Sequence, residues 1–210
     1  MRSSSSPGGS KRNDWAAAPK AVAGSLAGRV VVVGVTGSIA AYKVAVVVRR
    51  LRGEDADVYV LMTAAAVRFV GPATFRALSH HPVITDMWDP NGPWDEPHVA
   101  LGELADLYLI APASADMLGR LAAGLAGDIV SATALATRAP LVVAPAMSDR
   151  MAESPVVQEN LARLRARGVD VIGPDRGPLA SGKSGLGRMA EPEAIVSTVA
   201  ARLGGRPGPQ

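Results

Sequence analysis

The sequence predicts a single α/β domain built on a three-layer Rossmann-like or flavodoxin-like parallel sheet. Short runs rich in Val, Leu and Ile alternate along the chain with longer segments of helical periodicity. Runs that are apolar at almost every position are typical of strands covered by helices on both faces. A chain of 210 residues that is 48% hydrophobic can bury one sizeable core but leaves little for a second domain.

Five apolar runs are the expected strands. They are RVVVVGV, DVYVLM, ADLYLIAPA, APLVVAPA and GVDVIGP, at residues 29–35, 57–62, 105–113, 139–146 and 168–174. The segments between them, such as AAYKVAVVVRRLRG, have the length of a crossover helix, so the strands should run parallel. Ligands of such sheets bind beyond the carboxyl ends of the strands, so the residues after each run are the candidates for a site.

The two ends of the chain differ from this core in composition. Residues 1–28 are rich in Ser, Gly, Pro and Ala, and residues 204–210 are GGRPGPQ. We expect both to be flexible tails around a domain at residues 29–203. The N-terminal tail contains four basic residues and one acidic residue, which leaves 18 of each sign in the remainder. This balance argues against a nucleic-acid partner.

Several other classes of protein are excluded by composition. The absence of a signal-peptide core and of a long uninterrupted apolar stretch predicts a cytoplasmic protein without a membrane partner. The sequence has no cysteine and only three histidines. Disulfides, thiolate metal sites and a cysteine nucleophile within the chain are therefore excluded, and no metal site is expected.

The loop after the first strand suits a phosphate. In GVTGSIAAYK, Gly37 permits a tight turn, and Thr36 and Ser38 offer hydroxyls at the start of a helix. The loop lacks the G-x-G-x-x-G pattern, and no acidic residue follows the second strand to bind a ribose, so a mononucleotide fits better than NAD. An ordinary glycine-containing turn is the alternative for this loop taken alone.

Polar side chains also follow the later strands. Thr63 follows the second strand, Ser114 and Asp116 the third, and Ser148 the fourth. Each of them can either contact a ligand or cap the next helix. His98 precedes the third strand and belongs to the residue type that titrates near neutral pH.

Taken together, four segments resemble the flavin-containing cysteine decarboxylases in order and spacing. The segments are GVTGSIAAYK, HVALGELADLYLIAPASADMLGRLAAGLAGD, PAMSDRM and SGKSGLGRMAEP. The family comprises phosphopantothenoylcysteine decarboxylases and the peptidyl-cysteine decarboxylases of lanthipeptide-type pathways. The resemblance covers roughly residues 29–203. It implies an FMN-binding homo-oligomer built from trimers, with dodecamers as the larger assembly.

The resemblance also implies roles for single residues. His98 matches the catalytic histidine and is the expected base for the thiol proton. The implied FMN contacts are Gly37, Ser38, Ile39, Thr63, Phe69, Ser114, Ala115, Asp116 and Met147. The implied substrate contacts are Ala146, Met147, Ser148, Arg150, Met151 and Ser181.

The chain departs from the family's motifs at several of these positions. Asp116 and Met117 replace an Asn and a Thr of the flavin motif, and Ser148 and Ala152 replace an Asn and a Trp of the substrate motif. Ser181 replaces the cysteine with which the coenzyme A branch reduces its enethiol intermediate. Because serine is a far poorer proton donor than a thiol, Ser181 favours a reaction that stops at the enethiol.

These observations predict an enzyme that oxidatively decarboxylates a C-terminal peptidyl cysteine in ribosomal peptide natural-product biosynthesis. Its partner would be a precursor peptide, and we expect no synthetase domain because the chain ends soon after Arg202. The alternatives are a phosphopantothenoylcysteine decarboxylase of coenzyme A biosynthesis and a catalytically silent flavin-binding regulatory subunit. A prenyl-flavin synthase fits less well, since its first loop is usually richer in Gly and Ser.

Overall fold

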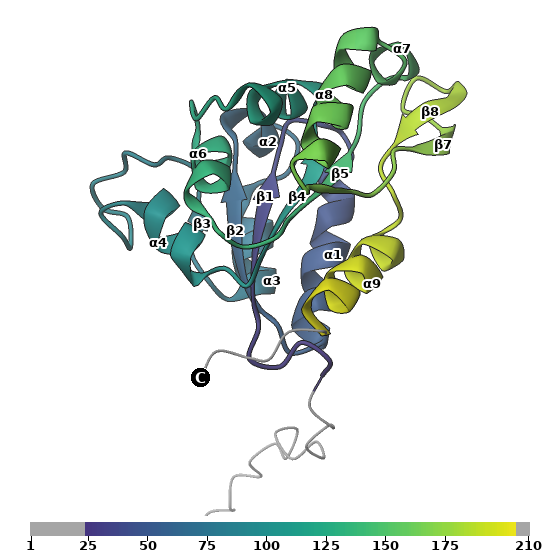
Figure 1. Cartoon of the computed structure of the whole chain (residues 1–210). Coiled ribbons are helices and arrows are strands. Elements are labelled where there is room, and N and C mark those ends of the chain that lie inside the picture. Colours follow the sequence, from purple (N-terminus) through teal and green to yellow (C-terminus); the bar gives the residue numbers. More distant parts are fainter. Residues whose placement is uncertain (1–23, 205–210) are drawn as a thin grey trace, which may run out of the picture.

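The computed structural model describes residues 24–204, which form a six-stranded parallel sheet between two layers of helices (Figure 1). The strands lie in the order β3-β2-β1-β4-β5-β6. Their bounds are β1 (Val30–Val35), β2 (Asp57–Met62), β3 (Val83–Ile84), β4 (Leu107–Ala113), β5 (Leu141–Pro145) and β6 (Asp170–Val171). From β1 the chain adds β2 and β3 on one side, and then β4, β5 and β6 on the other side. The topological switch point therefore lies between β1 and β4, and doubly wound sheets bind their ligands at this point. The predicted fold class is confirmed.

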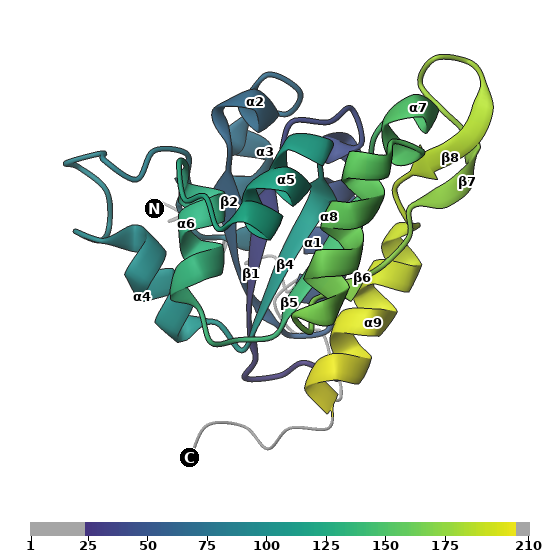
Figure 2. The same cartoon turned by 45° about the horizontal axis from the view of Figure 1, so that its top comes forward.

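Helices cover both faces of the sheet. One face carries α1 (Ala41–Gly53), α3 (Pro72–Ser79) and α9 (Pro192–Gly204); the other carries α4 (Pro97–Leu104), α5 (Ala115–Ala123), α6 (Ile129–Ala136) and α8 (Pro155–Ala166). Figure 2 shows α5, α6 and α8 in front of the sheet, with α1 and α3 behind it. Two short helices, α2 (Ala64–Val67) and α7 (Asp149–Ala152), follow β2 and β5 at the carboxyl edge.

The two cores explain why the strands are apolar at nearly every position. Val31, Val33 and Val35 of β1 belong to the cluster on the side of α1 and α9, whereas Val32 belongs to the cluster on the other face. All four are fully buried. Alternate side chains of a strand point to opposite faces, so a sheet covered twice requires an apolar residue at every position.

All five expected strands are present, and the sequence missed three others. The first is β3, which pairs with β2 over only two residues. The others are β7 (Asp175–Pro178) and β8 (Ser184–Arg188), an antiparallel hairpin separate from the main sheet. The hairpin contains glycines, one proline and charged residues instead of an alternating apolar pattern, so its sequence gives no strand signal. It stands beside α7 (Figures 1 and 2).

The packed domain begins earlier than the expected boundary at residue 29. Leu26 is fully buried, and its N–H donates to the carbonyl oxygen of Glu54 at 2.9 Å. The N–H of Gly24 donates to the Asp55 carboxylate at 2.6 Å. These contacts with the end of α1 place residues 24–28 with the domain. Gly204, the first residue of the predicted C-terminal tail, ends α9, while residues 1–23 and 205–210 of the predicted tails lie outside the described residues. Within residues 24–204, no helix is long and apolar enough to cross a membrane.

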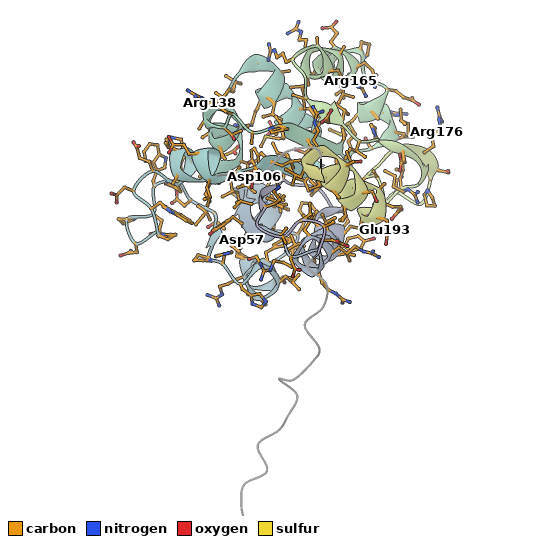
Figure 3. The ribbon with its side chains drawn as sticks, turned by 60° about the horizontal axis from the view of Figure 1, so that its bottom comes forward. Asp57, Asp106, Arg138, Arg165, Arg176 and Glu193 are labelled. Carbon is orange, nitrogen blue, oxygen red and sulfur yellow. The ribbon has the colours of Figure 1, made fainter. Side chains whose placement is uncertain are left out.

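The edge at which the strands begin is occupied by structural ion pairs. Figure 3 shows Asp57 and Asp106 at this edge. Asp106 accepts from the N–H of Val30 at 2.8 Å, and its carboxylate lies 3.5 Å from Nη1 of Arg29. The Asp57 carboxylate lies 2.7 Å from Nε2 of His81. These acids connect neighbouring elements, and the candidate site lies at the opposite edge.

Candidate functional site

Three of the predicted site residues are hydroxyl side chains that cap helices at the carboxyl edge. Thr63, Ser114 and Ser148 cap α2, α5 and α7. Their oxygens accept from the backbone N–H groups of Ala66, Met117 and Met151 at 3.2, 3.3 and 3.4 Å. A hydroxyl that accepts one hydrogen bond keeps its proton to donate. Capping and ligand binding are therefore compatible, because each cap fixes an oxygen at the edge where doubly wound sheets bind their ligands.

Thr36 has a different role from the phosphate contact that the sequence suggested. It is buried, its hydroxyl donates to the carbonyl oxygen of Pro112 at 2.5 Å, and it accepts from the N–H of Ser114 at 2.9 Å. The hydroxyl proton is thus used inside the protein, and Thr36 has no second proton to donate to a phosphate. Thr36 connects the loop after β1 to the loop after β4 and so fixes the distance between two walls of the site.

Replacing Thr36 with Val tests this connection. We expect a decrease in the free energy of unfolding of about 1–3 kcal/mol, because a buried carbonyl and a backbone N–H lose their partner. Urea unfolding followed by circular dichroism measures the change. Thr36→Ser keeps the hydroxyl and is the matched control, with a smaller expected loss. A loss in Thr36→Ser with none in Thr36→Val, which keeps a methyl group and lacks the hydroxyl, would show that the methyl group of Thr36, and not its hydrogen bonds, stabilises the loops.

A hollow of about 490 Å³ lies between the loops that follow β1, β2 and β4. We call it the sheet-edge hollow. The predicted residues that line it are Gly37, Thr63, Ser114, Ala115, Asp116 and Met151. A Cβ atom at Gly37 would lie 2.6 Å from that of Ala65, so the close approach of the first two loops requires glycine at this position.

Asp116 replaces an amide of the family's motif, and the structure compensates its charge. Its carboxylate accepts from Nε of Arg120 at 2.8 Å, and this hydrogen bond raises the pKa of the guanidinium. Nη1 of Arg120 also lies 3.8 Å from the carboxylate of Asp128. The acid at position 116 is therefore neutralised within its own helix and does not place an unpaired negative charge in the sheet-edge hollow.

A second hollow of about 540 Å³ lies between the start of α1, the loop after β5 and the β7–β8 hairpin. We call it the hairpin hollow. The predicted residues that line it are Ser38, Ile39, Ala146, Met147, Ser148 and Ser181. Lys43 and Arg188 also line it, and neither is among the predicted site residues. Both lie inside segments that carry the family resemblance, which is the signal that could have found them.

Gly187 holds the hairpin against the loop after β5. The N–H of Met147 donates to the carbonyl oxygen of Gly187 at 2.9 Å. Gly187 has a φ of +136°, and a Cβ atom there would lie 2.3 Å from the carbonyl oxygen of Met147. Only glycine allows this contact, which brings Ser181 and Ser148 to the same hollow from opposite sides.

The two hollows adjoin, because Gly37 lines one and the next residue, Ser38, lines the other. Their size is within the usual range for small-molecule and cofactor sites. The loop between them starts α1, and the amides and dipole of a helix N-terminus favour an anion such as a phosphate. The residues present therefore fit a flavin mononucleotide.

Three predicted site residues line neither hollow. Phe69 and Arg150 are exposed, and His98 lies in α4, across the molecule from the β7–β8 hairpin in both views (Figures 1 and 2). Nδ1 of His98 is buried and has no hydrogen-bond partner within the described part of the chain. A single subunit thus does not bring the expected base to the other site residues.

Comparisons with known proteins agree with this geometry. The family model described as Flavoprotein matches residues 20–204. The chain is 47% identical over 179 residues to the coenzyme A biosynthesis bifunctional protein CoaBC of Escherichia coli, covering 85% of the chain and 44% of that protein. It therefore spans less than half the length of this curated relative.

Two solved structures are similar over nearly their whole length. The FMN-dependent cysteine decarboxylase SpaF has a TM-score of 0.73 at 34% identity, with 84% of this chain and 97% of SpaF covered. A mutant PPC decarboxylase complexed with pantothenoylaminoethenethiol has a TM-score of 0.73 at 32% identity, with 82% and 97% covered.

The predicted peptidyl-cysteine substrate is wrong. The similarity to coenzyme A biosynthesis proteins extends over most of the domain at 47% identity, and it favours the alternative in that pathway. The prediction gave decisive weight to Ser181, which is one exposed residue at the turn of the hairpin. A single exposed position constrains the substrate less than the many buried and loop positions shared across the domain.

One family model thus matches residues 20–204 of this chain. The matched range includes the sheet edge with its hydroxyl caps and the loops that require glycine. The chain belongs to the flavoprotein family.

Proposed function

We propose that this chain decarboxylates phosphopantothenoylcysteine in coenzyme A biosynthesis. The observation that supports this function best is the 47% identity to the bifunctional coenzyme A protein over 85% of the chain. The predictions of an enzyme and of an FMN cofactor are confirmed by the family match and by FMN-dependent decarboxylases of the same fold.

The loops of the sheet-edge hollow are the proposed holders of FMN. Gly37 and Ser38 would receive the phosphate at the start of α1, and the hydroxyls of Thr63 and Ser114 would donate to the cofactor from their capping positions. When bound, FMN supplies hydride acceptance, which protein side chains cannot provide. The connection through Thr36 keeps the loops at a fixed separation, so the cofactor contacts are preorganised.

The hairpin hollow is the proposed site of the cysteine substrate. Ser148, fixed by its cap to α7, would donate its hydroxyl proton to the substrate carboxylate. Met147 and Ile39 would provide apolar contact, and the hairpin with Ser181 would exclude water from the sulfur. His98 would hold the proton that leaves the thiol.

The separation of His98 from both hollows supports the expected trimer. In this arrangement α4 of one subunit would face the hollows of a neighbour, and the buried, unpaired Nδ1 of His98 would gain a partner. The catalytic site would then be shared between subunits. Sedimentation analysis measures the assembly directly.

The reaction is tested by incubating the purified, FMN-loaded protein with phosphopantothenoylcysteine and following products by mass spectrometry. We expect turnover with release of carbon dioxide. Loss of carbon dioxide alone identifies the saturated thiol, whereas additional loss of a hydrogen pair identifies the enethiol. A protein that binds FMN but releases no carbon dioxide from this substrate would contradict the proposal.

A further inference from the structure

We propose that Lys43 and Arg188 form an anion-binding subsite that selects substrates with a phosphate at the end remote from the cysteine. This inference rests on the proposed function and deepens it. It assigns the side chains that distinguish a phosphorylated substrate from the same molecule without its phosphate.

Both cations meet in the hairpin hollow although they are far apart in the sequence. Nζ of Lys43 lies 3.3 Å from each carboxylate oxygen of Glu191, and Nη1 of Arg188 lies 3.3 Å from one of these oxygens. Lys43 comes from the first turn of α1 and Arg188 from the end of β8. The same hollow contains Ser148 and Ser181, so the cations and the proposed cysteine site share one space.

The charges in this cluster do not balance. Two cations share one carboxylate, which leaves a net positive charge. Nε of Arg188 is buried without a hydrogen-bond partner among residues 24–204, and such a donor costs stability unless a ligand satisfies it. Phosphate oxygens suit this group, because guanidinium and phosphate form short, charge-assisted hydrogen bonds.

Backbone packing holds the guanidinium in place. A Cβ atom at Gly177 would lie 3.0 Å from Cζ and from Nε of Arg188, so the facing strand of the hairpin contacts the side chain directly. The rest of the hollow includes Ile39 and Tyr42, which expose 56% and 59% of their surface. The hollow thus combines hydroxyl groups, exposed apolar side chains and a pair of cations. These groups match the cysteine end, the uncharged middle part and the phosphate of the proposed substrate, respectively.

The test compares phosphopantothenoylcysteine with pantothenoylcysteine as substrates of the FMN-loaded full chain. We expect the unchanged protein to prefer the phosphorylated substrate. Lys43→Gln and Arg188→Gln should each lower this preference in kcat/KM by about tenfold or more, through a higher KM, because each removes a charge-assisted hydrogen bond. Lys43→Arg keeps the charge and should keep the preference. Lys183→Gln, which removes an exposed cation from the same hairpin, is the matched control.

Equal kcat/KM values of the unchanged protein for both substrates would overturn the proposed subsite. Equal decreases in kcat/KM for both substrates in Lys43→Gln and Arg188→Gln would overturn it as well. FMN has a phosphate as well, so flavin fluorescence should compare the binding of FMN and riboflavin. If Lys43→Gln weakens only FMN binding and leaves the substrate preference intact, the cations serve the cofactor and the proposal is wrong.

Binding measurements separate this inference from the proposed function. If the unchanged protein decarboxylates neither substrate, calorimetry with phosphopantetheine and pantetheine still tests the subsite. A preference for the phosphorylated compound that disappears in Lys43→Gln would support it, and equal binding of the two compounds would overturn it.

Discussion

Replacing His98 with Asn is expected to lower kcat for phosphopantothenoylcysteine by about a hundredfold or more, the usual contribution of a general acid or base. FMN binding should be unchanged, because His98 is not among the residues proposed to hold FMN and lines neither hollow of its own subunit. Stopped-flow decarboxylation and flavin fluorescence measure the two quantities separately. His80→Asn is a suitable control, since His80 is exposed and has a φ of +62°, a conformation that Asn tolerates.

A shared site makes a second expectation testable with the same variant. Subunits with His98→Asn and subunits with Ser148→Ala should each be inactive alone. After mixing and subunit exchange they should recover part of the activity, because some neighbours then combine an intact histidine with an intact hairpin hollow. Unchanged turnover in His98→Asn would remove this residue from the mechanism. Failure of exchanged mixtures to recover would place both residues in one subunit's site.

Replacing Gly187 with Val is expected to combine a large loss of stability with a loss of substrate binding. The new side chain would meet the carbonyl oxygen of Met147 at 2.3 Å and would require a φ of +136°. Overpacking and backbone strain together should lower the free energy of unfolding by about 2–5 kcal/mol. Denaturant unfolding measures the loss of stability, and a higher KM would show that substrate binding in the hairpin hollow is weakened.

Gly168→Asn is the matched control for this substitution. Gly168 has a φ of +83°, and its missing Cβ would have no neighbour within 4 Å. We expect a small change in stability and none in KM. If Gly187→Val were as harmless as this control, the contact of the hairpin with the loop after β5 would not shape the substrate site.

The sequence identified the parts of the structure that depend on local patterns. Apolar residues at every position of Val31–Val35 predict a strand covered on both faces, and the structure buries all of them. The position of Thr63, Ser114 and Ser148 after successive strands predicts that they share one sheet edge, as they do. These inferences succeed because strand periodicity and parallel topology act over short stretches of chain.

The sequence could not show whether a hydroxyl group makes its hydrogen bonds within the protein or keeps them for a ligand. Thr36 and Ser38 look alike in the loop after β1, but the hydroxyl of Thr36 is consumed by Pro112 and Ser114. Nor could it find the β7–β8 hairpin, whose conformation depends on contacts such as that between Gly187 and Met147. Such contacts join residues distant along the chain, and no local pattern records them.

The sequence by itself therefore determined the layered sheet, its family and the sheet edge that carries the candidate site. The tertiary structure decided which residues share a hollow: it separated His98 from the hydroxyl caps and brought Lys43 together with Arg188 and Glu191. The physical reason is one of range. Secondary structure follows from neighbouring residues, whereas a site is assembled by packing between segments that only the folded chain brings into contact.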